Sequence, residues 1–292
     1  MKRSFQTVDV FTDRKFGGNP LAVVTEAEGL TTQQMQSIAA EFNLAETTFV
    51  LPPRDPANTA QVRIFTPKAE LPFAGHPNVG TAFVLARMGR GGDRYVFEEI
   101  AGLVPLDLTR EGGVVVATRL AAPQRLALVE RVAVEIVASA VGLAARDIVG
   151  EPVVAHTGTK FLFAEVASLA VLGQALCHVD VFRKHLPMER TVGVHLYVAG
   201  VEAGIDIRTR MFAPLFGVPE DPATGAANVT LIGLLAHRDP RAELTLHKTI
   251  GQGFEMGRPS LLQASAEKKA GTVIATHIGG RCVPMMSGTI EL

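Results

Sequence analysis

The sequence predicts an α+β fold made of two similar lobes, and three observations support this prediction. The chain has 292 residues, about twice the length of a typical domain. Many short strand-like segments are separated by only a few helical ones, which favours an α+β fold over regular β-α-β alternation. Two short motifs also recur at an interval close to half of the chain.

The recurring motifs describe a strand, a proline turn, a polar residue followed by proline, and a helix. The string RIFTP at 63–67 resembles RMFAP at 210–214, at an offset of 147 residues. The string GHPNVGTA at 75–82 resembles EDPATGAA at 220–227, at an offset of 145. We therefore expect an internal duplication, with chance similarity between two loop-to-helix junctions as the alternative.

The expected lobes are residues 1–122 and 123–292, separated at the proline-containing segment 121–124. The last strand, at about 279–292, could pack with the N-terminal lobe. A cleft between two such lobes is where we expect the functional residues.

Two helices are expected in the first half. The first has a capping box formed by Thr31 and Gln34, followed by apolar residues at helical spacing up to Phe42. The second has an apolar stripe that starts at Val79, and it ends near Gly89. Strand-like segments surround these helices: 5–11, 21–24, 47–51, 61–65, 94–98, 103–108 and 114–118.

The second half repeats this arrangement. A helix is expected at about 127–141, helical segments near Ala167 and Val179, and a third long helix from Thr224 to about Ala236. Strands are expected near Val153 and Phe161, at 194–198 and 204–211, and after Glu243.

The composition excludes several classes of protein. Lys and Arg number 28 and Asp and Glu 29, so the formal net charge of −1 gives no cationic field for nucleic acid. No apolar run reaches the length of roughly 20 residues that a membrane-spanning helix needs, and, because no apolar segment follows the basic residues near the start, we expect no secretory signal. Two cysteines without a CxxC pair, and histidines without ligand spacing, predict no disulfide framework and no metal site. We expect a cytoplasmic globular protein without a nucleic-acid or membrane partner.

Three ionisable residues are candidates for chemistry. His76 and Asp221 each precede an expected helix, whose first N–H groups and positive dipole end attract an anion. The bland alternatives are a helix cap for Asp221 and a buried structural histidine for His76. Glu46 lies between a helix and an apolar strand, where it could be simply solvated. In an apolar cleft, burial would instead raise its pKa and suit it to take and return a proton.

Several strings resemble the phenazine-biosynthesis isomerase (PhzF-like) family over essentially the whole chain. They are VDVFT at 8–12, GGNPLAVV at 17–24, NLAETTFV at 43–50, AGHPNVGTA at 74–82 and EDPATGAA at 220–227. The family is similar in fold to diaminopimelate epimerase. The resemblance therefore implies two lobes, each a curved, mostly antiparallel sheet wrapped around a central helix.

The resemblance also implies an activity, namely moving a proton on a small carboxylate-bearing substrate without metal or organic cofactor. Glu46 would be the catalytic acid/base, with His76 and Asp221 orienting the substrate and assisting. The implied substrate-binding positions are Gly75, Asn19, Gly225 and Ala226. The family further implies a homodimer.

Ala226 departs from the family pattern, which usually has a serine there. The loss of this hydroxyl leaves the substrate unassigned and keeps two other functions open. One is a non-catalytic protein that binds a small acid. The other is a two-base racemase or epimerase, for which Asp221 is the only second base that the sequence offers. Cys177 and Cys282 lie away from both helix starts, which disfavours a two-thiol mechanism.

Overall fold

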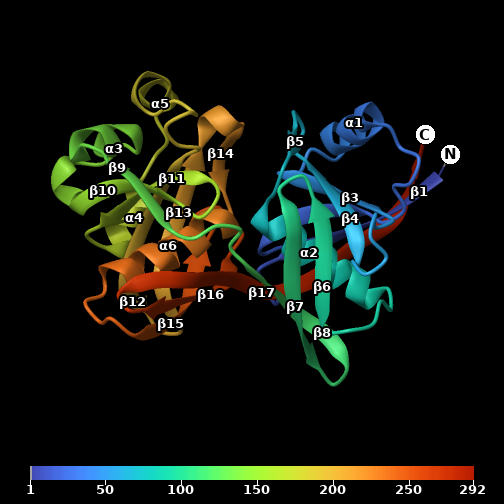
Figure 1. Cartoon of the computed structure of the whole chain (residues 1–292). Coiled ribbons are helices and arrows are strands. Elements are labelled where there is room, and N and C mark those ends of the chain that lie inside the picture. The colour runs from blue at the N-terminus through green and yellow to red at the C-terminus, as the bar shows by residue number, and fades with distance from the viewer. Residues whose placement is uncertain (1) are drawn as a thin grey trace. The chain divides into compact units, whose positions relative to one another are not determined.

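A computed structural model describes residues 2–292 and shows a mixed fold of helices and strands (Figure 1). Within these residues it contains six α-helices, and most of the regular structure consists of strands. The chain forms two compact units. Unit 1 extends to Ala121 and resumes at Gly279–Leu292, and unit 2 comprises Ala122–Ile278.

Unit 1 contains two helices, and most of its strands come from the first third of the chain. Its elements are β1 (Lys2–Val10), β2 (Asn19–Val24), α1 (Thr32–Phe42), β3 (Glu46–Leu51), β4 (Ala60–Phe65), β5 (Glu70–Leu71), α2 (Gly75–Arg87), β6 (Arg94–Glu99), β7 (Gly102–Glu111), β8 (Val114–Ala121) and the greater part of β17 (Thr272–Glu291).

Unit 2 contains the other four helices. Its elements are β9 (Ala127–Arg131), α3 (Val134–Ala140), β10 (Ile148–His156), β11 (Lys160–Val166), α4 (Leu169–Gln174), α5 (Val179–His185), β12 (Val194–Glu202), β13 (Ile205–Ala213), β14 (Val218–Asp221), α6 (Gly225–Arg238), β15 (Leu244–Gln252) and β16 (Ser260–Lys269).

The strands of the two units pair in the same order and the same directions. In unit 1, β1 is antiparallel to β2, β2 parallel to β3, β3 antiparallel to β4, and β4 antiparallel to β5 and parallel to β6. In unit 2, β10 is antiparallel to β11, β11 parallel to β12, β12 antiparallel to β13, and β13 antiparallel to β14 and parallel to β15. Parallel neighbours need a crossover connection. The crossovers are helical at matching places: α1 corresponds to α4 and α5, and α2 corresponds to α6.

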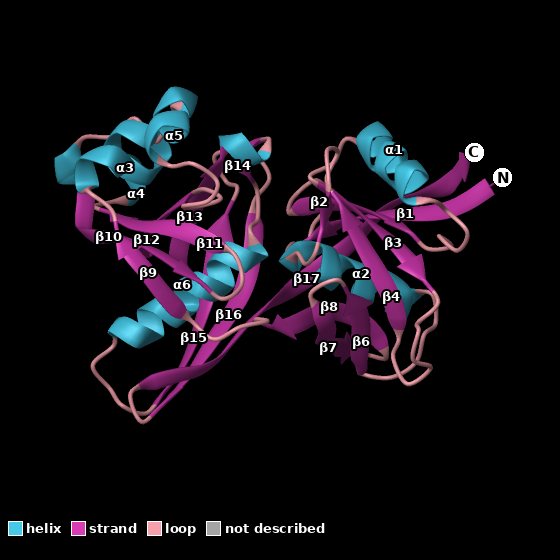
Figure 2. Cartoon of the chain, turned by 45° about the horizontal axis from the view of Figure 1, so that its top comes forward, coloured by secondary structure: helices cyan, strands magenta, loops and turns pink. Residues whose placement is uncertain are grey.

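The helices α2 and α6 pack against the strands of their own units (Figure 2). Every residue of α2 from Gly75 to Ala86 is buried, so this helix is enclosed on all sides rather than amphipathic. A side chain at Gly80 would clash, because a Cβ there would lie 2.6 Å from Leu21 and 2.8 Å from Val10. The glycine therefore lets β1 and β2 approach the helix closely.

Most expected elements are present, and one is wrong. The capping box of α1 is confirmed, since the Thr31 side chain accepts from Gln34 N–H and the Gln34 side chain accepts from Thr31 N–H. The helix expected at 127–141 is instead strand β9 followed by the short helix α3. The segment Ala127–Arg131 pairs antiparallel with β10, and this pairing outweighs the helical propensity of its alanine, leucine and glutamate residues.

Candidate active site

Glu46 and His76 lie next to each other in unit 1. The Nε2 atom of His76 is 3.4 Å from Oε2 of Glu46, and the two side chains are only 6% and 13% exposed. Glu46 is the first residue of β3 and His76 is the second residue of α2, so the partners come from different elements well separated in the sequence. The structure thus brings together two of the three residues expected to carry chemistry.

The pair is not an ion pair at neutral pH. Burial lowers the pKa of His76 to about 3, because the charged imidazolium would lose its hydration. A neutral imidazole holds one N–H and one bare nitrogen. Its Nε2 can therefore either donate a hydrogen bond to the Glu46 carboxylate or, in the other tautomer, accept a hydrogen bond from the protonated carboxyl group, and the ring stays neutral in both cases.

The N-terminus of α2 lacks a side-chain cap. Its N-cap residue is Ala74, which makes no side-chain hydrogen bond to the first turn, whereas α1 has a complete capping box. The N–H groups of Gly75 and His76 therefore lie at a helix start with no capping side chain. Such a start attracts a carboxylate or phosphate.

The strand order explains why Asn19 belongs to the same end of unit 1. Asn19 opens β2 and pairs with Val10, the last residue of β1, and its side chain is fully buried. Two residues further along β2, Leu21 pairs with Glu46. The turn that leads into Asn19 needs Gly18, which has a φ of 63° and whose added Cβ would lie 2.3 Å from the Val10 carbonyl.

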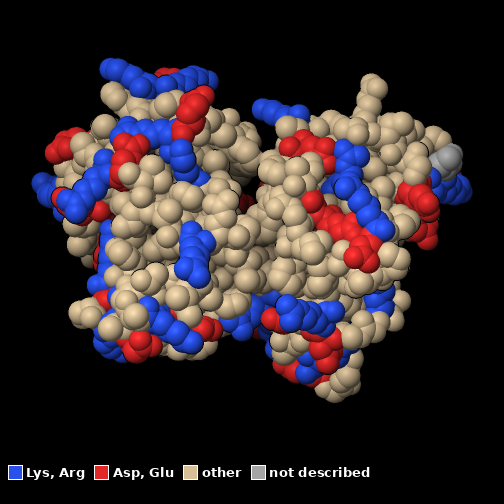
Figure 3. Space-filling view, in the orientation of Figure 1, with Lys and Arg blue, Asp and Glu red and all other residues tan. Residues whose placement is uncertain are grey.

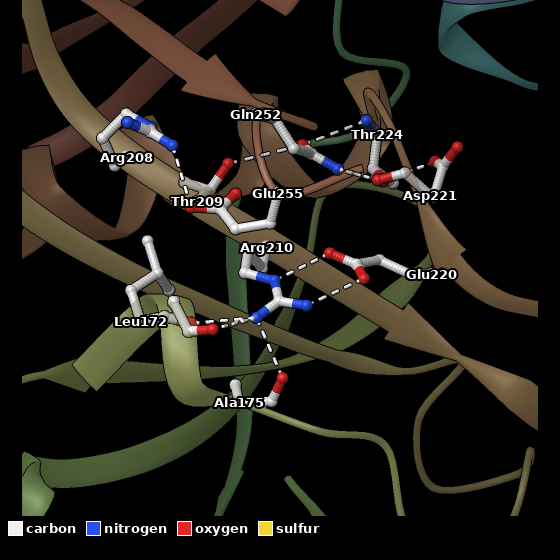
Figure 4. Close-up of polar contacts among 11 residues, drawn as sticks. Leu172, Ala175, Arg208, Thr209, Arg210, Glu220, Asp221, Thr224, Gln252 and Glu255 are labelled. Atoms are coloured by element: carbon white, nitrogen blue, oxygen red, sulfur yellow. Dashed lines mark hydrogen bonds and ion pairs between the residues drawn. The ribbon is translucent and has the colours of Figure 1, made fainter. Parts of the chain in front are cut away.

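Asp221 belongs to unit 2 and is the last residue of β14. The Thr224 hydroxyl donates to its Oδ2 over 2.5 Å, and Gln252 donates from Nε2 to its backbone carbonyl over 2.7 Å (Figure 4). The side chain is half-buried. Its carboxylate is therefore oriented by a hydroxyl donor that lies three residues further along the chain.

The alignment of His76 with Asp221 at an offset of 145 is wrong in the structure. His76 lies inside the first turn of α2, whereas Asp221 ends a strand four residues before α6 begins. Both motifs contain a proline, but α2 starts before Pro77 and α6 starts after Pro222. Proline is tolerated in a first helical turn, so the sequence alone does not indicate on which side of it a helix begins.

Gly225 and Ala226 are the first two residues of α6, matching Gly75 and His76 of α2 in their helical positions. The N-cap residue Thr224 makes no side-chain bond to the α6 first turn. Ala226 is half-buried, and it stands at the position for which the resemblance implies a serine. The start of α6, like that of α2, thus lacks a side-chain cap from its N-cap residue.

A buried ion pair fixes β14 to β13. Arg210 donates to Glu220 from Nε over 2.7 Å and from Nη2 over 2.9 Å (Figure 4). Its Nη1 also donates to the carbonyls of Leu172 and Ala175 at the C-terminal end of α4. Because Glu220 is held in this way, its neighbour Asp221 has a fixed backbone position.

Unit 1 contains the corresponding pair. Arg63 donates to Glu70 over 2.6 Å and 2.7 Å, and its guanidinium lies over the Phe65 ring. The guanidinium of Arg210 lies over Phe212 in the same way. Each unit thus has an arginine on one strand and a glutamate on the next, shortly before a central helix.

Sequence reasoning missed Gln252, which is fully buried at the end of β15 and contacts both Asp221 and Thr224. An available signal was a glutamine directly after an apolar residue and a glycine, in a strand ending at the Gly253 turn. Polar side chains at such inward positions need partners, because an unsatisfied buried amide is costly.

The two cysteines are free thiols and poor nucleophiles. Burial raises the pKa of Cys282, on β17, to about 12, and it also raises the pKa of Cys177. Among residues 2–292, no group of three or more His, Cys, Asp or Glu side chains could hold a metal ion. Within the same residues, no helix is long and apolar enough to cross a membrane. On the face drawn in Figure 3, basic and acidic side chains are interspersed rather than gathered by sign.

A mostly buried carboxylate beside a neutral imidazole, at an uncapped helix start, is an arrangement typical of an enzyme that transfers protons. The chain belongs to the PhzC-PhzF family, described as phenazine biosynthesis-like protein, whose profile matches residues 8–288. It is an isomerase of this family.

Similar proteins agree with this assignment. The chain is 37% identical over 285 residues to trans-2,3-dihydro-3-hydroxyanthranilate isomerase of Pseudomonas chlororaphis, covering 98% of both chains. It is 34% identical over 303 residues to an uncharacterized isomerase of Mesorhizobium japonicum, covering 99% of this chain and 98% of that one.

Solved structures show the same fold. A PhzF-family protein of Bacillus anthracis matches with a TM-score of 0.89 at 24% identity, over 100% of both chains. A hydroxyproline epimerase of Agrobacterium vitis matches with a TM-score of 0.63 at 14% identity, over 99% of this chain and 91% of that one. The expected family is confirmed, and the fold is similar to that of an epimerase.

Proposed function

We propose that the protein is a cofactor-independent isomerase that moves a proton between two carbons of a small carboxylate-bearing substrate. Glu46 takes the proton from one carbon and returns it to another carbon of the same molecule. The observation that carries this proposal is the buried position of the Glu46 side chain against neutral His76. A glutamate with a purely structural role at the surface would be solvated and would not be enclosed with an imidazole.

The pairing suits a reversible proton transfer. With its proton on Nε2, the neutral ring of His76 stabilises the Glu46 carboxylate; when Glu46 is protonated, the ring proton lies on Nδ1 and Nε2 faces the acid as a bare nitrogen. Neither state leaves a buried charge facing another charge, because His76 is neutral throughout. Asp221, held by Thr224, orients the substrate and assists in this proposal.

The substrate carboxylate would be received by N–H groups rather than by basic side chains. Both central helices start without a side-chain cap, at Gly75 and at Gly225. Asn19 offers an amide at the same end of unit 1 as Glu46. Backbone donors at helix starts bind carboxylates well and need no cationic surface.

An internal duplication, which we propose from the matching strand order, disfavours two symmetric bases. Val194 pairs with Phe212 as Thr47 pairs with Phe65, so Gly193 takes the position of Glu46 in unit 2. No side chain fits there, because a Cβ at Gly193 would lie 2.3 Å from the Phe212 carbonyl. The second unit therefore has no counterpart of the acid/base, which supports a single carboxyl that does both steps.

The proposal is tested by Glu46→Gln, with trans-2,3-dihydro-3-hydroxyanthranilate, the compound named for the Pseudomonas relative, as the first probe. Incorporation of solvent deuterium and isomerisation are followed by NMR. We expect the variant to lose at least about a hundredfold in turnover, because the amide cannot accept the proton. Glu41→Gln, on the exposed face of α1, is the matched control and should retain full turnover.

Unchanged turnover in Glu46→Gln would overturn the mechanism. Tight binding of substrate-like acids without any hydrogen exchange, in the parent protein, would instead favour the non-catalytic binding protein.

A further inference from the structure

We propose that a hydrogen-bond chain with one fixed direction ends on the carboxylate of Asp221, and that Gln252 and Thr224 are the positioning residues that hold this carboxylate. The chain runs through five side chains: His195, Asn228, Gln252, Thr224 and Asp221. The part played by Asp221 in catalysis rests on the proposed function, but the chain itself does not.

The orientation of the Gln252 amide follows from its backbone partners. Its Nε2 lies 2.7 Å from the carbonyl of Asp221, which can only accept. Its Oε1 lies 3.2 Å from the N–H of Thr224, which can only donate. If the amide were turned round, its oxygen would face the carbonyl oxygen of Asp221 and its NH2 group would face the N–H of Thr224. Both contacts would be repulsive, so only one orientation of the amide is allowed.

This orientation determines the direction of the Thr224 hydroxyl. Gln252 donates from Nε2 to Oγ1 of Thr224 over 3.0 Å. The single hydroxyl proton of Thr224 is therefore left to donate to Oδ2 of Asp221. A carboxylate accepts such a bond and has no proton to return, so the last step is charge-assisted.

The other end of the chain is determined in the same way. Asn228 turns its Nδ2 toward the Thr224 carbonyl, at 3.1 Å, and toward Oε1 of Gln252, at 2.7 Å, which are both acceptors. Its Oδ1 therefore faces Nε2 of His195, at 3.1 Å, and His195 must carry its proton on that nitrogen. The Nδ1 atom of His195 is buried without a hydrogen-bond partner among the described residues, as expected for the bare nitrogen of this tautomer.

Burial protects the chain from exchange with water. The side chains of His195, Asn228 and Gln252 belong to fully buried residues, with 0% exposure. Burial also lowers the pKa of His195 to about 4, so the ring remains neutral and keeps one N–H. Thr224 and Asp221 are half-buried, so the three buried side chains hold the donors in place, and a network in which every proton has one allowed place restricts the rotation of Asp221.

The first test removes the hydroxyl while keeping the shape of the side chain, in Thr224→Val, with Thr224→Ser as the conservative control. Crystal structures of the parent and both variants are compared at the Asp221 side chain. We expect Asp221 to keep its conformation in the parent and in Thr224→Ser, and to rotate or become multiple in Thr224→Val. An Asp221 that keeps its conformation and position in Thr224→Val would overturn the proposal.

The second test reverses one donor. In Gln252→Glu, studied at alkaline pH so that the introduced carboxyl is ionised, an acceptor oxygen replaces Nε2, and the Thr224 hydroxyl is drawn to it and away from Asp221. Gln263→Glu makes the same change on the exposed side of β16, where the side chain contacts only Thr249 among the described bonds, and serves as the control. We expect a displaced Asp221 in the first variant only; an undisturbed Asp221 in both would contradict the chain.

Kinetics with the same probe substrate then separate positioning from folding. We expect Thr224→Val to lose roughly tenfold to a hundredfold in kcat with a much smaller change in KM, and Thr224→Ser to recover most of it. Equal kcat in Thr224→Val and the parent would show that Asp221 needs no positioning. If the parent does not turn over this probe, the substrate is a different acid, and the crystal structures alone decide whether the chain holds Asp221.

Discussion

At the scale of single residues, two adjacent glutamates on β6 have opposite environments. The carboxyl oxygens of Glu99 are buried beside Asn78, and burial raises the pKa of Glu99 to about 8 against the opposing effect of the Asn78 side chain. Glu98 faces the other way and accepts bonds from the Asn58 side chain and from the N–H groups of Asp55 and Arg54, which lower its pKa. Alternation along a strand thus gives neighbouring residues opposite electrostatic roles.

These environments predict opposite pH dependences of stability. Glu99 is protonated in the folded protein up to about pH 8 but ionises near pH 4.5 when unfolded. Between these two pH values only the unfolded chain gains from ionising Glu99. The free energy of unfolding is therefore highest below pH 4.5 with respect to this residue, and it falls as the pH rises toward 8. Glu99→Gln should remove this loss and raise the free energy of unfolding at pH 8 by an amount of the order of a few kcal/mol.

Glu98→Gln is the matched control with the opposite sign. Its folded pKa is lowered, so the stability it contributes is present at neutral pH and is lost as the pH falls through that pKa. Urea unfolding at several pH values measures both variants. A Glu99→Gln curve parallel to that of the parent from pH 5 to 8 would show that Glu99 is not buried as a neutral acid.

The second prediction at this scale concerns Ala226. Its place in the first turn of α6 is half-buried, so a serine there can present its hydroxyl without overpacking. If the family serine serves the substrate named for the Pseudomonas relative, Ala226→Ser should raise kcat/KM for that compound roughly tenfold, the usual worth of one hydrogen bond. Ala227→Ser, fully buried one residue further on, should not raise it. Equal kcat/KM in Ala226→Ser and the parent would indicate another natural substrate.

The residues of the site were predictable to different degrees. Glu46 and His76 follow from motif resemblance, and no periodicity indicates that their side chains meet. The position of Gln252 near a strand end was a weak local signal, but the partners of Gln252 and Asn228 could not be predicted, because these contacts form only when β15 and α6 fold against β14. Long-range contacts of single polar residues leave no local pattern in a sequence.

At the scale of elements, the two central helices show what local signals determine and what they leave open. The apolar stripe of α2 is evident in the sequence, but its first residue is not, because the proline motif fits a helix that starts before or after it. The sequence of β9 predicts a helix because its propensities are helical, while its pairing with β10 is long-range. Local propensity therefore predicts correctly whether a segment is a helix or a strand only where the long-range pairing favours the same structure.

Packing against α2 gives a prediction for this element. Gly80→Ala places a methyl group against Leu21, Val10 and Val8, all fully buried. We expect a loss of about 1–3 kcal/mol in the free energy of unfolding, despite the better helix propensity of alanine. Gly173→Ala, on the exposed side of α4, adds a Cβ with nothing within 4 Å and should instead gain up to about 1 kcal/mol. A Gly80→Ala variant as stable as the parent in urea would mean that the helix and strands are not in close contact.

At the scale of the whole molecule, the division into units suggests which parts can fold alone. Unit 2 is one continuous segment, Ala122–Ile278, and its strands β9 to β16 pair with one another inside it. Unit 1 is discontinuous, because β1 pairs over its whole length with the C-terminal part of β17, from Lys2 opposite Glu291 to Val10 opposite Cys282. The strand β8 also pairs with β17. Removing β17 would therefore expose two strand edges of unit 1.

We expect a fragment of residues 122–278 to fold cooperatively, and a fragment of residues 1–121 to remain unfolded or to aggregate. The antiparallel register of β1 and β17 shows how the missing strand can be restored. Leu292 lies near the start of β1, where the Lys2 ammonium is 2.9 Å from the Glu291 carboxylate. A permuted fragment, with residues 279–292 joined by a short Gly-Asn linker to residues 1–121, would form a hairpin and restore both edges. Circular dichroism and thermal melting should show one sharp transition for 122–278 and for the permuted fragment. A sharp transition for 1–121 alone would mean that the C-terminal strand is dispensable, and none for the permuted fragment would mean that unit 1 depends on unit 2 for its fold.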